Sequence, residues 1–126
     1  MITKISSIYG FPIYVCSKDT TTKELSKIDS YYKDYDDNDF VAQYRHKAGF
    51  VHYIKDENDK EITGYIVYIF EYDIGTIAHE AMHVFDSMTL QCDLGKNTDS
   101  SEYRAYFLEW IETQICSALH LTLTLE

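Results

Sequence analysis

The sequence contains the segment Asp73-Ile-Gly-Thr-Ile-Ala-His-Glu-Ala-Met-His-Val-Phe-Asp-Ser-Met88, and the other predicted elements can be arranged around it. Asp73 is a residue type that caps helix N-termini. Apolar residues follow it at helical spacing, at Ile77, Ala81, Val84 and Met88. His79 and His83 are four residues apart, so on a helix their imidazoles lie on one face, about one turn apart. Such a pair can bind a single metal ion, and the segment therefore predicts a metal-binding helix.

Zinc is the expected ion, because imidazole is a good zinc ligand and a catalytic zinc site leaves one coordination position open for water. Glu80 lies about 100° around the helix from His79, near enough to reach that water without competing for the metal. Its expected role is that of general base. The alternative is that His79 and His83 are ordinary histidines on a half-exposed helix.

A catalytic zinc site has three protein ligands, so a third donor is expected downstream. Glu102 is the first choice, because it lies nineteen residues past His83 at the start of a second predicted helix. As the last residue of Asp99-Ser-Ser-Glu102 it could instead complete a capping box. Asp86 returns to the metal-binding face and is expected to orient a histidine through its distal ring nitrogen. Two further carboxylates remain as fallback ligands, Glu109 and Glu112.

A β-hairpin is predicted before the metal-binding helix. Residues 50–54 and 62–70 are rich in aromatic and β-branched side chains, and a polar connection from Lys55 to Lys60 separates them. The second run is apolar on both faces, so we expect it to be buried between the metal-binding helix and another layer. We interpret His52, in the first run, as a surface or packing residue rather than a ligand.

Four further elements follow from the sequence pattern. Residues 11–16 form a strand with Pro12 at its entry, and residues 20–35 form one amphipathic helix. The acidic run 34–39 is expected to be a solvated loop rather than a calcium site, since it lacks the glycine and distal glutamate of an EF-hand. After a loop over residues 90–99, a last helix continues to Leu119 with a predicted core stripe of Ala105, Leu108, Ile111 and Ile115. The tail over residues 121–125 alternates like a short strand.

The segment from His79 to Asp86, followed by Ser101-Glu-Tyr-Arg-Ala-Tyr-Phe-Leu-Glu-Trp-Ile111, resembles gluzincin-type HExxH zinc metallopeptidases, in particular small metallopeptidases of phages and prophages. The resemblance spans roughly residues 49–115. It implies an α+β, minimal zincin-like domain, in which a small, mostly antiparallel sheet packs on the HExxH helix and a following helix that carries a glutamate.

The resemblance also implies roles for individual residues. His79, His83 and Glu102 would bind zinc, and Glu80 would activate water. Gluzincins commonly add a Tyr or His that stabilises the oxyanion, and Tyr106, one turn beyond Glu102, is the first choice for it. Tyr103 is the second choice, and ordinary packing in the core is the alternative for both tyrosines.

Length and composition limit the remaining possibilities. A chain of 126 residues fits one domain, 1–126. A formal net charge of −10 without a basic run argues against nucleic acid as a partner. No apolar run approaches a membrane span or a secretory signal, and three cysteines without a CxxC pair suggest buried, reduced thiols, so we expect a cytoplasmic protein.

The expected function is zinc-dependent hydrolysis of peptide bonds in a peptide or protein substrate. The alternative is a catalytically inactive, zinc-stabilised binding or regulatory protein of phage or prophage origin. Glu80 distinguishes the two, because a structural zinc site does not need a carboxylate beside its first histidine. Hydrolysis of a non-peptide amide by zinc is a third possibility that these residues do not separate from proteolysis.

Overall fold

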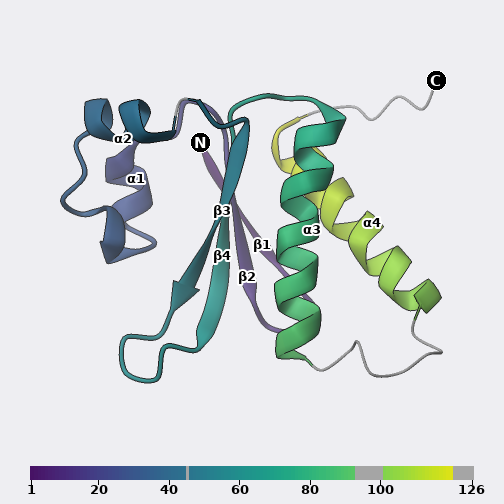
Figure 1. Cartoon of the computed structure of the whole chain (residues 1–126). Helices are drawn as coiled ribbons and strands as arrows, with labels where there is room; N and C mark the ends of the chain where they lie inside the picture. Colours follow the sequence, from purple (N-terminus) through teal and green to yellow (C-terminus); the bar gives the residue numbers. More distant parts are fainter. Residues whose placement is uncertain (45, 93–100, 121–126) are drawn as a thin grey trace.

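The structure is a computed structural model that describes residues 1–44, 46–92 and 101–120. Figure 1 shows the sheet between two layers of helices, with α1 and α2 on one side and α3 and α4 on the other. The elements in chain order are β1 (Ile2–Ser6), β2 (Pro12–Cys16), α1 (Thr22–Ser26), the short 3₁₀ helix η1 (Ser30–Tyr32), α2 (Asp37–Tyr44), β3 (Gly49–Lys55), β4 (Ile62–Ile69), α3 (Ile74–Gln91) and α4 (Ser101–Ala118).

The four strands form one mixed sheet in the order β1-β2-β4-β3. The pairs β1–β2 and β3–β4 are antiparallel, whereas β2 and β4 are parallel. The predicted α+β class, the small mostly antiparallel sheet and the β3–β4 hairpin are therefore confirmed. Strand β1 was not predicted, because its alternating Ile-Thr-Lys-Ile-Ser pattern is short and half exposed. The sheet order places β3 at one edge, and this edge is where the histidine-bearing helix lies.

Strand β4 is buried on both faces, as its apolar sequence predicted. On one face Tyr65, Val67 and Ile69 pack into a core with α3 and α4. On the other face Ile66 and Tyr68 pack with the helices of the N-terminal third. Each fully buried side chain of this size stabilises the fold by about 1.5–3 kcal/mol relative to leaving it exposed, so β4 anchors the layers on both sides of the sheet.

The predicted single helix over residues 20–35 is wrong. Helix α1 ends with its C-cap at Lys27, and the chain turns before the separate η1 begins. The reason lies in Asp29, whose carboxylate accepts a hydrogen bond from the Tyr31 backbone N–H at 2.9 Å. Aspartate side chains offer the backbone this local alternative to continued helix.

The acidic run is also only partly a loop, because α2 begins within it at Asp37. The Asp36 carboxylate accepts from the Asn38 N–H at 2.7 Å, as a helix cap does. The Asp37 carboxylate accepts from the N–H and the hydroxyl of Thr22 at 2.8 and 2.7 Å. Phe40, the one apolar residue of the first turn, is buried. Acidic residues that the pattern assigned to solvent therefore start a helix and attach it to α1.

Helix α3 has the predicted helical conformation, whereas metal binding by it stays a prediction. Asp73 is its N-cap, with a carboxylate that accepts from the Thr76 N–H at 2.8 Å. The predicted apolar stripe is buried, at Ile77, Ala81, Val84 and Met88. This stripe faces the core, which turns the two histidines toward the edge of the sheet. Within the described ranges no helix is long and apolar enough to cross a membrane.

Helix α4 is also confirmed, although its predicted core stripe is only half correct. Ile111 and Ile115 are buried as expected, but Ala105 is exposed. Phe107 takes its place and packs on Tyr9, with ring centroids 5.3 Å apart. The predicted capping residues Asp99 and Ser100, most of the predicted 90–99 loop and the predicted strand over 121–125 lie outside the described residues. Of the cysteines, which are all free, Cys16 and Cys116 are buried and Cys92 is half-buried.

Candidate metal centre

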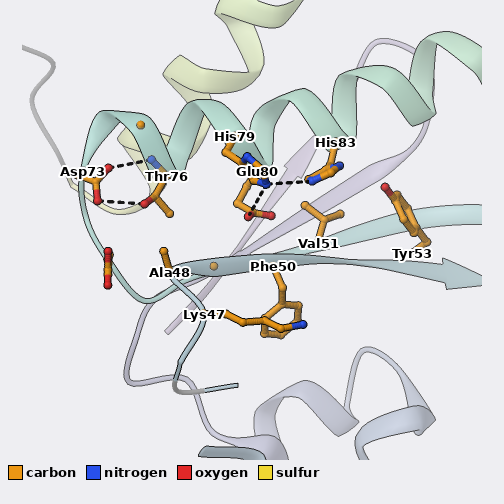
Figure 2. A pocket seen from close by; sticks show the side chains of 13 residues that line it. Lys47, Ala48, Phe50, Val51, Tyr53, Asp73, Thr76, His79, Glu80 and His83 are labelled. Atoms are coloured by element: carbon orange, nitrogen blue, oxygen red, sulfur yellow. Dashed lines mark hydrogen bonds and ion pairs between the residues drawn. The ribbon is translucent and has the colours of Figure 1, made fainter. Parts of the chain in front are cut away.

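An open pocket of about 860 Å³ lies between the beginning of β3 and the exposed side of α3. Figure 2 shows His79, Glu80 and His83 on the helix, with Val51 and Tyr53 on the strand facing them. The connection from β4 to α3 closes one end through Glu71 and Asp73. The core stripe of α3 and the edge position of β3 together create this pocket.

His79 and His83 point into the pocket as a pair. Their Nε2 atoms lie 3.2 Å apart, and their ring planes are inclined at 81°. Two imidazoles on a tetrahedral zinc ion, each with a Zn–N bond of about 2.0–2.1 Å, have nitrogens about 3.3–3.4 Å apart. The observed separation, at which the two rings are within hydrogen-bond distance of each other, is close to the one that a shared zinc ion requires.

The Glu80 side chain lies next to this pair but is buried, with 4 % of the residue exposed. Its Oε1 atom is 4.0 Å from His79 Nε2, and its Oε2 atom has no hydrogen-bond partner among the residues that the structure describes. Burial raises the pKa of the Glu80 carboxyl group, and the electrostatic influence of the nearby His79, His83 and Lys47 side chains acts in the opposite direction. A buried carboxylate oxygen without a partner is costly in a folded protein and calls for an explanation. A bound metal ion and its water would supply one.

Glu102 is not brought to this pair. It is exposed on the first turn of α4, where its carboxylate accepts a hydrogen bond from the Tyr106 hydroxyl at 3.5 Å, and it does not line the pocket. Helix α4 runs back along α3, so its first turn lies toward the C-terminal end of α3, whereas His79 is in the N-terminal half of α3 (Figure 1). In the three described ranges, no three His, Cys, Asp or Glu side chains form a metal-binding group. Ligation by Glu102 stays a prediction.

The other candidate carboxylates also lie outside the pocket lining. Asp86 is exposed on α3 and makes no hydrogen bond to His79 or His83. Glu109 and Glu112 belong to α4, where burial, and next the charge of Glu109, raise the pKa of Glu112. None of these three carboxylates lines the pocket with His79 and His83. The expected role of Asp86 in orienting a histidine stays a prediction.

The two tyrosines expected near the reacting groups lie on another surface. Tyr106 is 63 % exposed and, with Tyr103, borders a small apolar depression beside Ile8 and Trp110. The Tyr103 hydroxyl is hydrogen-bonded to that of Tyr9. Neither tyrosine lines the pocket with the histidines, so a catalytic role for Tyr106 would need the first two turns of α4 in a different position.

Tyr53 is the residue that sequence reasoning missed. It lines the pocket, and its side chain points from β3 toward α3 on the His83 side (Figure 2). Burial raises the pKa of its hydroxyl, and the charges of Asp86 and Glu80 raise it further, so the hydroxyl keeps its proton and can donate it. Alternation along β3 was the available signal. His52, the residue before Tyr53, points to the opposite face, where its Nε2 lies 2.8 Å from Asp29 Oδ2, as the packing interpretation predicted.

No protein-family model, curated protein or solved structure matches the chain. The resemblance to gluzincins therefore stays a prediction, and the site itself is the basis for a functional proposal.

Proposed function

We propose that the protein is a zinc-dependent metallopeptidase, with a minimal zincin-like domain and its active site in the pocket between β3 and α3. The observation that carries the proposal is the convergence of His79 and His83 Nε2, 3.2 Å apart, beside the buried Glu80 carboxylate. Two imidazoles, a side-chain type that binds zinc, and a buried carboxylate, a side-chain type that accepts protons, thus lie at the wall of one open pocket, and this supports the proposal.

The donor set and the unpartnered Glu80 oxygen fit zinc, although the described residues supply two ligands rather than three. When bound, zinc would polarise the scissile carbonyl and lower the pKa of a water molecule. His79 and His83 would hold the ion through Nε2. Glu80 would accept the proton of the attacking water and pass it to the leaving amine.

Tyr53 would donate a hydrogen bond to the carbonyl oxygen of the substrate as negative charge develops on it. This assignment replaces Tyr106 as the first choice, because Tyr53 lines the pocket and Tyr106 does not. For the third zinc ligand we retain Glu102, whose carboxylate is exposed and accepts a long hydrogen bond from the Tyr106 hydroxyl. Its ligation requires the first turn of α4 to move toward the histidines.

An extended peptide or protein segment is the proposed substrate. Strand β3 is at the edge of the sheet, so within the described part of the chain no strand pairs with its outer backbone N–H and C=O groups. Such an edge can pair with an added strand. A substrate paired there would run past Val51 and Tyr53 and present its peptide bonds to the histidine pair.

A zinc-stabilised binding protein without turnover is the rival proposal. It accounts for the histidine pair but not for Glu80, which is buried with an unpartnered oxygen directly beside it. Removing a carboxylate of this kind would relieve a desolvation cost in a purely structural site. Retaining it is understandable where the carboxylate must accept a proton.

The test is the Glu80→Gln variant. The amide keeps the shape of the side chain but does not accept the proton of water, so zinc content and fold are expected to be unchanged. Hydrolysis of a peptide that the wild type cleaves should fall by about 10²–10⁴-fold at matched zinc content. Equal rates would remove Glu80 from the mechanism. Failure of the zinc-loaded wild type to cleave any member of a broad peptide library would favour the binding protein.

A further inference from the structure

The first residue of β3, Gly49, lies directly against the side chain of Glu80. A Cβ atom built at Gly49 would be 3.2 Å from Glu80 Cγ and 2.9 Å from the Tyr68 carbonyl oxygen. The first distance is tight for carbon atoms and the second is shorter than real Cβ contacts allow. The space that a side chain at position 49 would need is therefore already used, in part by Glu80.

Backbone conformation does not account for this glycine. Among the described residues Gly10 is the glycine with a positive φ, of 83°, whereas Gly49 lies in regular β3 and pairs with Ile69 of β4. Any residue can adopt such a strand conformation. What position 49 requires is the absence of a side chain, because the Tyr68 carbonyl oxygen of β4 and the Glu80 side chain of α3 both lie against it.

We propose that Gly49 is a positioning residue for Glu80: its missing side chain leaves the space in which the Glu80 carboxylate is held beside His79 and His83. As far as it concerns catalysis, this inference rests on the proposed function. Glu80 is enclosed between α3 and the start of β3, so a methyl group at position 49 would displace its Cγ and with it the carboxylate. The Cγ atom would have to yield by a few tenths of an ångström. Even a shift smaller than 1 Å is expected to lower the rate, since a 1 Å misplacement can cost about 10²-fold.

The chain contains a matched control in Gly64, which lies in β4 of the same hairpin and pairs with Ile54. A Cβ atom there would be 3.0 Å from Pro12 Cγ and 3.2 Å from the Pro12 carbonyl oxygen. Gly64→Ala therefore introduces comparable crowding at a place that does not touch Glu80. Any effect that is specific to the Glu80 contact should be absent from it.

The experiment is a double-mutant cycle measured by urea unfolding, with the same excess of zinc in every sample. Gly49→Ala and Gly64→Ala are each expected to lower the urea midpoint by about 0.5–1 M, as overpacking does. In the Glu80→Ala background, the decrease in urea midpoint caused by Gly49→Ala should be smaller by at least about half, because the added methyl group gains room. The decrease caused by Gly64→Ala should stay the same. If Gly49→Ala lowers the urea midpoint equally in the wild-type and Glu80→Ala backgrounds, the proposal is overturned and the crowding is assigned to the Tyr68 carbonyl.

If Gly49→Ala alone does not fold, recovery of folding in Gly49→Ala/Glu80→Ala supports the proposal. Failure of that double variant, while Gly64→Ala/Glu80→Ala folds, overturns it.

A kinetic comparison separates this proposal from the proposed function. With a cleaved peptide, Gly49→Ala should lower kcat by at least about tenfold and change KM by less than about twofold, relative to Gly64→Ala. Equal kcat values for the two variants would contradict positioning. If the zinc-loaded wild type cleaves nothing, the proposed function fails, while the unfolding cycle still decides whether Gly49 sets the position of Glu80.

Discussion

Tyr53 and Tyr106 are the two candidates for the proposed hydrogen-bond donor to the substrate, and they lie on different surfaces of the protein. We expect Tyr53→Phe to keep the zinc and the fold but to lower kcat by about 10²-fold, the usual cost of removing one donor to a developing oxyanion. Tyr106→Phe should change kcat by less than about twofold. Steady-state kinetics on one cleaved peptide measures both variants. A larger decrease in kcat for Tyr106→Phe than for Tyr53→Phe would mean that the beginning of α4, with Tyr106, reaches the pocket.

Glu102 gives a second prediction at the level of a single residue. If it is the third ligand, Glu102→Ala should weaken zinc binding by at least about tenfold, since changes to groups outside the ligand shell already cost 10–100-fold. Competition with a zinc-binding dye measures the affinity, and Glu109→Ala on the same helix is the control. An unchanged affinity would remove Glu102 from the site, and a loss in Asp86→Ala would then assign the ligand to α3.

The residues of the site that were predicted from the sequence are those that one helical turn places together. The spacing of His79 and His83 is a local property of α3, and the structure shows the expected convergence. Tyr53 and Gly49 reach the same pocket from β3, and their positions depend on how a strand packs against a helix. Alternation along β3 indicates which side chains share a face of the strand, but it does not show that α3 packs against that face.

Helix α3 is positioned by its cap as well as by its apolar stripe. The Asp73 carboxylate accepts hydrogen bonds from the N–H and the hydroxyl of Thr76 at 2.8 and 3.0 Å, and these bonds lower the pKa of Asp73. Asp73→Ala is expected to lower Tm by about 3–5 °C at pH 7, as the loss of an N-cap does in a domain of this size.

The effect of Asp73 should also depend on pH. Its pKa in the folded chain lies below the value of about 3.9 in the unfolded chain, so its contribution is complete above that pH and is lost as pH falls through the folded pKa. The Tm difference between wild type and Asp73→Ala should therefore narrow between pH 5 and pH 2. Asp73→Asn, which can still cap, should stay close to wild type at pH 7. A difference that does not change with pH would contradict this account of the cap.

Elements with a strong apolar pattern were predicted well from the sequence, whereas the short helices of the N-terminal third were not. Strands β3 and β4 and helix α3 have a strong apolar pattern and clear end signals, and they were predicted correctly. In the N-terminal third, the side chains of Asp29 and Asp36 bind nearby backbone N–H groups and thereby decide where helices end and begin. A prediction based on apolar periodicity overlooks such side-chain bonds, because it treats aspartates as solvent-facing residues.

At the level of the whole molecule, the sheet order β1-β2-β4-β3 was not predictable from the chain. The hairpin signal joins β3 to β4, but nothing local indicates that β2 pairs in parallel with β4. This pairing buries β4 in the centre of the sheet and leaves β3 at the edge. The pocket is a consequence, since α3 covers the sheet beside β3, the edge strand among the described residues.

The central claim is that α3 binds a zinc ion through its histidine pair. The most direct test is the zinc content of the protein purified without chelators and without added metal, measured together with its folding. We predict about one zinc per chain for the wild type. The control variant His52→Ala should also hold about one zinc, because the His52 ring lies on the opposite face of β3. Zinc should be lost in His79→Ala and His83→Ala. Natively folded wild-type protein without bound metal, or zinc retained in both of these variants, would contradict the account.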